Sequence, residues 1–104
     1  MATKFRLVLL GFGNVAQGLA KVLVSKREDL RRKFGFDYKI VAVADIAKGS
    51  IMNNSGLDLG RLLSLAREKG SITGYPGGLK DLSSVETIRK ADANVLVEST
   101  WTNL

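Results

Sequence analysis

The sequence predicts an α/β fold in which a doubly wound parallel sheet carries helices on both faces. Residues 4–10 form a nearly continuous apolar run, which is typical of a parallel strand buried on both sides. A glycine-rich turn and a long amphipathic segment follow directly, and a second apolar run ends at residue 45. This succession of strand, helix and strand is one βαβ unit, which is expected to cross over with a right hand.

The first helix is expected over residues 14–33. Apolar side chains recur in it at nearly helical spacing, which favours a single stripe facing the sheet. The members of this stripe are Val15, Leu19, Val22, Leu23, Leu30 and Phe34. Gly35 supplies a stop signal for the helix. The second strand is expected over residues 38–45, which are β-branched and mostly apolar.

Residues 46–57 are expected to form a loop. Asp58 then has the position of a helix cap, and its helix is expected to run to Lys69 and to end at Gly70. The side chains expected to face inward are Leu59, Leu62, Leu63 and Ala66.

A short helix and a third strand complete the pattern. Ser83 and Glu86 have the spacing of a capping box, which predicts a helix through Lys90. The third strand is expected over residues 94–98. We expect it to lie beside the first strand, on the side away from the second.

The turn after the first strand matches the pattern G-x-G-x-x-G/A, placed between a strand and a helix as this pattern requires. Gly11 allows the tight turn, Gly13 leaves the backbone open to a ligand, and Ala16 lets the helix pack closely. Gly18 is expected to add a further small contact. Backbone N–H groups at a helix start suit a phosphate. The sequence therefore predicts a Rossmann-like unit that binds the pyrophosphate of NAD or NADP.

The residues expected to bind the cofactor at this turn are Gly11, Phe12, Gly13, Asn14, Val15 and Ala16. Phe12 is expected either to line the adenosine side or to shield the turn. No metal site is expected.

Asp45 ends the second strand, where an acid completes the fingerprint by accepting hydrogen bonds from the adenosine ribose. It follows Gly13 by 32 residues, where about 20 is usual, and the long first helix accounts for the excess. The alternative for Asp45 is a turn residue at a strand end. Its charge would repel a 2′-phosphate, which Lys48 could attract, so the choice between NAD and NADP stays open.

Ser99 and Thr100 follow the third strand. The carboxyl ends of neighbouring parallel strands meet at the edge of the sheet where cofactors bind, so we expect these hydroxyls to contact the cofactor. A polar strand exit is the alternative. No catalytic side chain is visible, and the proton-transfer residue is expected beyond residue 104. Since complete sheets of this kind have about six strands, residues 1–104 are expected to be a partial dinucleotide-binding domain.

Composition excludes several classes of protein. The chain has 104 residues, 45% of them hydrophobic and 25% charged, as in soluble globular domains. It contains no cysteine and no histidine, which excludes zinc sites and histidine-dependent triads within it. No apolar run approaches the roughly 20 residues that cross a membrane, and no signal-peptide pattern precedes the first strand. We expect a cytoplasmic protein without a membrane partner.

The net charge of +6 comes partly from a basic cluster in the first helix. Its members are Lys21, Lys26, Arg27, Arg31, Arg32 and Lys33. Such a cluster could bind nucleic acid. We favour a solvated helix face whose cations suit the carboxyl end of the helix dipole, and expect no nucleic-acid partner.

Residues 11–18 (GFGNVAQG), 41–45 (VAVAD) and 95–103 (VLVESTWTN) together resemble the amino-terminal region of homoserine dehydrogenases. The resemblance covers the whole chain, and the last of these segments is its most specific part. The chain has Ala16 where the family commonly has glycine and Trp101 where it often has proline, which leaves the path of the final loop open.

The resemblance implies an enzyme of threonine, methionine and isoleucine biosynthesis that reduces aspartate semialdehyde to homoserine with NADH or NADPH. It implies that Gly11 through Ala16 hold the pyrophosphate and that Ser99 and Thr100 lie near the nicotinamide. The catalytic lysine, the substrate carboxylates and the dimer-forming region of the family lie downstream. The complete enzyme is thus expected to be a homo-oligomer with a small-molecule substrate, and this chain alone to be inactive.

Two alternatives remain open. The chain could belong to another NAD(P)-dependent oxidoreductase, of the aspartate dehydrogenase or dihydrodipicolinate reductase type. It could also be a nucleotide-sensing module that performs no chemistry.

Overall fold

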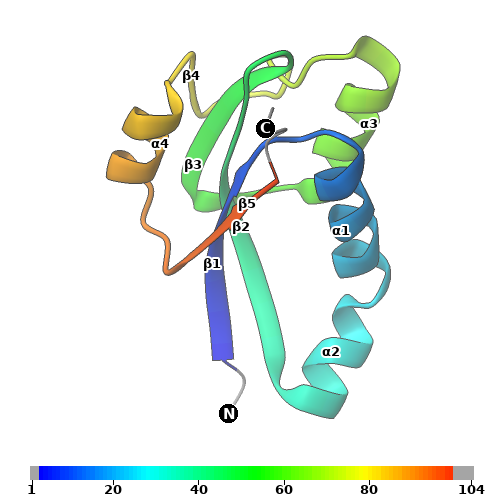
Figure 1. Ribbon diagram of the computed structural model, residues 1–104. Helices are drawn as coiled ribbons and strands as arrows, with labels where there is room; N and C mark the ends of the chain where they lie inside the picture. The colour runs from blue at the N-terminus through cyan, green and yellow to red at the C-terminus, as the bar shows by residue number, and fades with distance from the viewer. Residues whose placement is uncertain (1–2, 100–104) are drawn as a thin grey trace, which may run out of the picture.

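The computed structural model describes residues 3–99, which form an open five-stranded sheet with helices on both faces (Figure 1). In chain order the elements are β1 (Thr3–Leu10), α1 (Asn14–Ser25), α2 (Arg27–Phe34), β2 (Phe36–Asp45), β3 (Gly49–Leu57), α3 (Leu59–Lys69), β4 (Leu79–Lys80), α4 (Ser84–Lys90) and β5 (Val95–Glu98). The strands lie in the order β4-β3-β2-β1-β5. Helices α1 and α3 cover one face of the sheet, and α4 lies on the other (Figure 1).

Strand β1 lies inside the sheet and pairs in parallel with β2 on one side and β5 on the other. This confirms the predicted βαβ unit and the predicted place of the third strand. The carboxyl ends of all three strands therefore reach the same edge, where β1 continues into the glycine-rich turn. The α/β class is confirmed, but the sheet is mixed, because β3 and β4 run antiparallel to their neighbours.

The expected loop over residues 46–57 was wrong, because residues 49–57 form β3, paired antiparallel with β2. Its first part is apolar enough to be buried, as Ile51 and Met52 are. The polar run Asn53-Asn54-Ser55 breaks the alternation that a half-buried strand usually shows. Three residues connect β2 to β3, so the hairpin depends on a tight turn that hydrophobic spacing alone does not indicate.

The expected single helix over residues 14–33 is two helices that meet at Lys26. The predicted apolar stripe is also displaced around the axis. In α1 the buried residues are Ala16, Ala20 and Leu23, whereas Val15 is 75% exposed and Val22 is 54% exposed. Two alanines allow α1 to approach the sheet closely, and the larger valines are left on its flank.

The other two predicted helices are confirmed with their caps. Asp58 accepts a hydrogen bond from the N–H of Arg61 at 3.2 Å, and Gly70 ends α3 in a left-handed conformation. Leu59, Leu62 and Ala66 are buried, while Leu63 is half-buried against the core. At α4, Ser83 and Glu86 form the predicted capping box.

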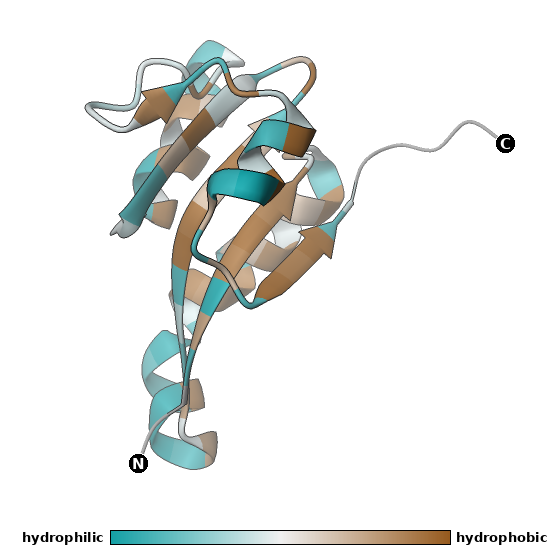
Figure 2. Cartoon of the chain, turned by 90° about the vertical axis from the view of Figure 1, so that its left-hand side faces the viewer, coloured by the Kyte–Doolittle hydropathy of each residue, from teal (hydrophilic) through white to brown (hydrophobic). Residues whose placement is uncertain are grey.

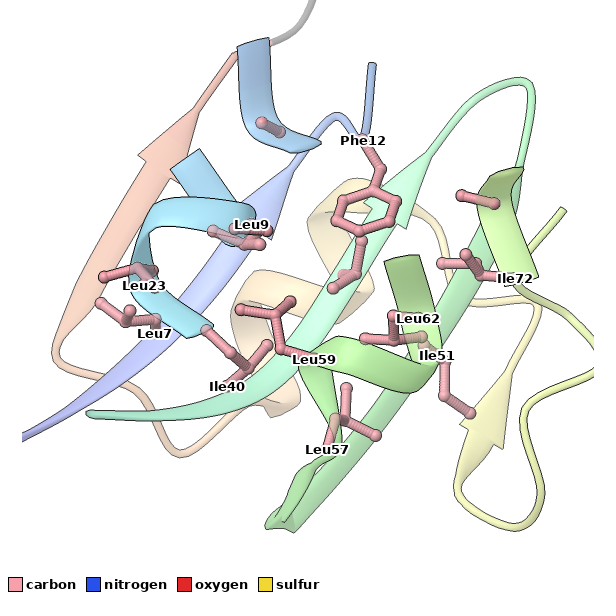
Figure 3. Packing of buried hydrophobic residues seen from close by; sticks show 14 of the residues in the cluster. Leu7, Leu9, Phe12, Leu23, Ile40, Ile51, Leu57, Leu59, Leu62 and Ile72 are labelled. Atoms are coloured by element: carbon pink, nitrogen blue, oxygen red, sulfur yellow. The ribbon is translucent and has the colours of Figure 1, made fainter. Parts of the chain in front are cut away.

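The core divides into two clusters, one on each face of the sheet. The larger lies under α1 and α3 and includes Leu9, Ile40 and Leu62 (Figure 3). The smaller lies toward α4 and includes Val8, Val41 and Met52. The central strands are mostly apolar, whereas α2 is largely hydrophilic (Figure 2). Within residues 3–99, no helix has the length and apolar character needed to cross a membrane.

Candidate functional site

The glycine-rich turn is hydrogen-bonded to strand β2 at the point where β1 ends. Gly11 has a φ of 92°, a conformation that side chains rarely adopt. Its N–H donates to the carbonyl oxygen of Ala44 at 2.6 Å. The turn therefore leaves the sheet in one defined direction, and this explains why glycine is needed at the position.

Helix α1 begins with free backbone donors. Gly13 is the N-cap and provides no side-chain cap. Among residues 3–99, no acceptor bonds the N–H groups of Gly13, Asn14 or Val15. A Cβ added at Gly13 would meet nothing within 4 Å. These donors lie at the positive end of the helix dipole, which favours an anion.

The small residues of the motif divide into two kinds. Ala16 is buried, as its packing role predicts. Gly18 is exposed, and a Cβ added there would meet nothing within 4 Å. The expected close contact at Gly18 is therefore wrong, because the residue lies on the outer flank of α1.

Phe12 does not line the adenosine side, because its side chain is fully buried and points into the larger core cluster (Figure 3). Its backbone is also occupied. The N–H donates to Oδ2 of Asp45 at 2.7 Å, and the carbonyl oxygen accepts from Nε2 of Gln17 at 2.7 Å. Phe12 thus shields and anchors the turn, and its side chain cannot contact a ligand.

Asp45 connects two loops through its carboxylate. Besides the bond from Phe12, its Oδ1 accepts from the N–H groups of Ala47 at 2.9 Å and Lys48 at 2.8 Å. Burial raises the pKa of Asp45, but these three donors and the charge of Lys48 outweigh that effect and lower the pKa below its ordinary 3.8. The alternative of a turn residue at a strand end is confirmed, because Asp45 closes the β2–β3 turn beside the glycine-rich turn. The contact with the adenosine ribose stays a prediction.

Lys48 lies in the same turn, and its backbone is bonded on both sides. Its N–H reaches Asp45, while its carbonyl oxygen accepts from the N–H of Ile72 at 3.0 Å and from the Ser71 hydroxyl at 3.2 Å. The residue is half-buried. The structure thus brings Lys48 next to Asp45, as the three-residue spacing predicts.

Ser99 lies against the end of β1. Its N–H donates to the carbonyl oxygen of Leu10 at 2.9 Å, and its hydroxyl is 3.4 Å from the same oxygen and 3.5 Å from the carbonyl oxygen of Gly11. The predicted meeting of the two strand ends is therefore present. Thr100 lies outside the described residues.

A cavity of about 390 Å³ lies beside Asp45, and sequence reasoning did not find it. Its walls come from the β2–β3 hairpin, from the segment before α4 and from the first turn of α4. They include Asp45, Ile46, Ser50, Asp81, Ser83 and Glu86. The capping box indicated where α4 begins, but without β3 nothing in the sequence placed that end beside Asp45.

The three arginines of the basic cluster form ion pairs with acidic side chains. Asp37 is buried and forms ion pairs with Arg27 at 3.0 Å and Arg31 at 3.5 Å. Arg32 pairs with Asp29 at 3.0 Å. Arg27 also lies over the ring of Tyr38, 4.5 Å from its centre. Arg27 and Arg31 thus hold α2 to β2, which favours the structural interpretation of the cluster.

A cavity of about 420 Å³ lies at the amino ends of β1 and β2, away from the glycine-rich turn. Its lining includes Lys4, Arg27, Lys39 and Asp58. Lys4 and Arg27 both pair with Asp37. The candidate ligand site is therefore the opposite edge, where the N–H groups at the start of α1 have no acceptor among the described residues.

Comparison with known proteins shows which family the chain resembles. The family model for glutamate/leucine/phenylalanine/valine dehydrogenases matches residues 2–103. An NAD(+)-dependent homoserine dehydrogenase from Pseudomonas canavaninivorans is 37% identical over 97% of this chain and 29% of its own length. A homoserine dehydrogenase from Methanocaldococcus jannaschii is 35% identical over 94% of this chain and 29% of its own.

Among solved structures, a mutant of a hyperthermophilic archaeal homoserine dehydrogenase in complex with NADPH is similar with a TM-score of 0.78 and 25% identity. The match covers 95% of this chain and 30% of that one. The chain thus spans less than a third of the length of these relatives.

Proposed function

Since this chain belongs to the glutamate/leucine/phenylalanine/valine dehydrogenase family, we propose that it is the NAD(P)-binding part of a homoserine dehydrogenase-like oxidoreductase. One observation carries the proposal. The N–H groups at the start of α1 are unbonded within the described chain and open onto free space at Gly13. A pyrophosphate has the charge and the acceptor oxygens that such donors need.

The cofactor would lie along the carboxyl edge of the parallel strands. Its pyrophosphate would take the N–H groups of Gly13, Asn14 and Val15, which the helix dipole favours. The nicotinamide half would extend toward Ser99 and Thr100. The adenosine half would extend toward Asp45 and the cavity beside it, where Lys48 is the nearest candidate for a 2′-phosphate.

The reaction would need more than these residues. A nicotinamide cofactor supplies the hydride, and the protein supplies orientation and proton transfer. We propose that residues 1–104 are a partial dinucleotide-binding domain, and that the catalytic and dimer-forming region lies outside them. The complete protein would reduce aspartate semialdehyde to homoserine in threonine and methionine biosynthesis, as a cytoplasmic homo-oligomer.

The matched variants Gly13→Val and Gly18→Val test the binding site. Both glycines have open space at the Cβ position and neither has a positive φ, so both variants are expected to fold. Valine at position 13 would occupy the space proposed for the pyrophosphate. We expect it to weaken NAD and NADP binding at least about tenfold, equivalent to 1.4 kcal/mol. Gly18→Val should bind as the parent does.

Isothermal titration with NAD and NADP measures both effects. Equal affinity in the parent and Gly13→Val would contradict the proposed site. Tighter binding of NADP that is lost in Lys48→Ala would assign the 2′-phosphate to Lys48, and indifference to that change would remove the lysine from the site. The two remaining interpretations, another NAD(P)-dependent oxidoreductase and a nucleotide-sensing module, share this site and differ in the substrate that the complete protein turns over.

A further inference from the structure

We infer that Asp45 is a positioning residue, whose carboxylate holds the glycine-rich turn in its anion-binding shape before any ligand arrives. The inference rests on the proposed function, since it concerns how the same site is built. It differs from the ribose contact that a strand-end acid predicts, because it gives Asp45 an effect on ligands that contain no ribose.

The argument begins with how the turn is held. The parallel ladder between β1 and β2 ends with the bond from the Gly11 N–H to the Ala44 carbonyl oxygen. The next donor along the chain is the N–H of Phe12, and its acceptor is the side chain of Asp45 instead of a backbone oxygen. The carboxylate thus continues the ladder by one residue, at the point where the backbone turns toward α1.

The carboxylate is itself held from the other side. The N–H groups of Ala47 and Lys48 bond its Oδ1, so its orientation is set by the β2–β3 turn. Three of the roughly four acceptor positions of a carboxylate are then filled by backbone donors. At most one acceptor position is left for a ribose hydroxyl. Both carboxylate oxygens are already used to join the glycine-rich turn to the β2–β3 turn.

The consequence for a ligand lies in Phe12. Its side chain is buried, and both its N–H and its carbonyl oxygen are bonded within the chain. Phe12 therefore gives no donor to the anion, but it directly precedes Gly13, whose N–H has no acceptor among the described residues. Fixing Phe12 fixes the direction of the following donors, and a preorganised site binds more tightly because less motion is lost on binding.

Ligands that lack parts of the cofactor separate the two roles. We compare the parent with Asp45→Asn and Asp45→Ala, using inorganic pyrophosphate, adenosine and NAD as probes. Positioning predicts that pyrophosphate and NAD lose affinity by a similar factor of about tenfold, equivalent to one charged hydrogen bond or somewhat less. Adenosine should bind these variants as it binds the parent. A loss confined to NAD and adenosine, with pyrophosphate unchanged, would overturn the inference and leave Asp45 as a ribose contact.

Asp58→Asn is the matched control. Asp58 also accepts a backbone N–H, at the start of α3. Its replacement removes one negative charge, as Asp45→Asn does, but at a place distant from the glycine-rich turn. It should leave pyrophosphate binding unchanged, and a loss equal to that of Asp45→Asn would overturn the inference. If the parent binds neither pyrophosphate nor NAD, the proposed function fails, which distinguishes that outcome from a failure of the Asp45 role alone.

The parent protein offers a test that needs no variant. In a pH titration followed by NMR, the amide protons of Phe12, Ala47 and Lys48 should all shift with the protonation of one carboxyl group. A Phe12 amide that stays unchanged while those of Ala47 and Lys48 shift would show that Asp45 does not join the two turns, and would overturn the inference even where the variants fail to fold.

Discussion

Two aspartates at opposite ends of β2 show how a single carboxylate can organise its surroundings. Asp45 closes the carboxyl end of the strand, and Asp37 lies near its amino end, buried against Arg27 and Arg31. Asp45 accepts three backbone N–H groups and Asp37 accepts one, and each has a lowered pKa although burial raises it. A sequence shows an acid at a strand end in both cases, but only the positions of the donors show that each acid is a structural link.

Replacement of Asp37 tests this link. At pH 7, Asp37→Asn should lower the free energy of unfolding by about 1–3 kcal/mol, because hydrogen bonds to charged groups are worth more than neutral ones. The bonds concerned run to Asp37 from the N–H of Tyr38 at 2.9 Å and from Nε of Arg27 at 3.1 Å. Urea unfolding measures the difference. An unchanged midpoint would show that the Asp37 carboxylate does not contribute measurably to holding α2 on β2.

The lowered pKa also sets the direction of the pH dependence. A carboxyl group whose pKa falls on folding stabilises the protein fully above its unfolded value and loses that effect as the pH drops through the folded value. Asp37 and Asp45 both fall below their ordinary 3.8. The parent should therefore lose stability on acidification below about pH 4. Asp37→Asn should lose less over the same range, and parallel curves would contradict the assignment.

At the scale of elements, local signals predicted well and relations between elements did not. The N-terminal caps of α3 and α4 are each formed by residues that lie within four positions of one another in the sequence, and both caps are confirmed. The sequence did not predict β3, because this strand is stabilised by its pairing with β2 and its own residues show no regular strand pattern. The buried face of α1 was misplaced for a related reason. Periodicity showed that one side is apolar, but how closely the helix approaches the sheet decided that alanines, not valines, face inward.

Neighbouring residues of α1 test which face is buried. Leu23 is 7% exposed and Val22 is 54% exposed, although the predicted stripe contained both. Leu23→Ala should cost about 2–4 kcal/mol of unfolding free energy, as expected for a buried leucine. Val22→Ala should change it by no more than about 0.5 kcal/mol. Thermal or urea unfolding of the two variants checks this, and equal losses would restore the face predicted from periodicity.

At the scale of the whole molecule, the sequence predicts the strand-end residues of the candidate site but not the cavity beside them. The glycine motif, Asp45 and Ser99 were found because each stands directly at a strand end, and the parallel order of β2, β1 and β5 brings those ends together. The cavity beside Asp45 was not found, because its walls come from a hairpin and from residues around the start of α4 that are distant in sequence. Under the proposed function, this edge of the sheet is where the cofactor would bind.

Binding a cofactor would not be enough for turnover, because the protein must also supply proton transfer, and Asp45 is a poor candidate for that role. Efficient general acids and bases have pKa values near the working pH, whereas the pKa of Asp45 is lowered and its oxygens bond backbone N–H groups. We therefore expect the 104-residue chain to show no oxidation of NADH or NADPH above the blank with aspartate semialdehyde. The same sample should bind NAD by titration, which shows that it is folded. Turnover that disappears in Gly13→Val would contradict this expectation, since it would place a proton-transfer group within these residues.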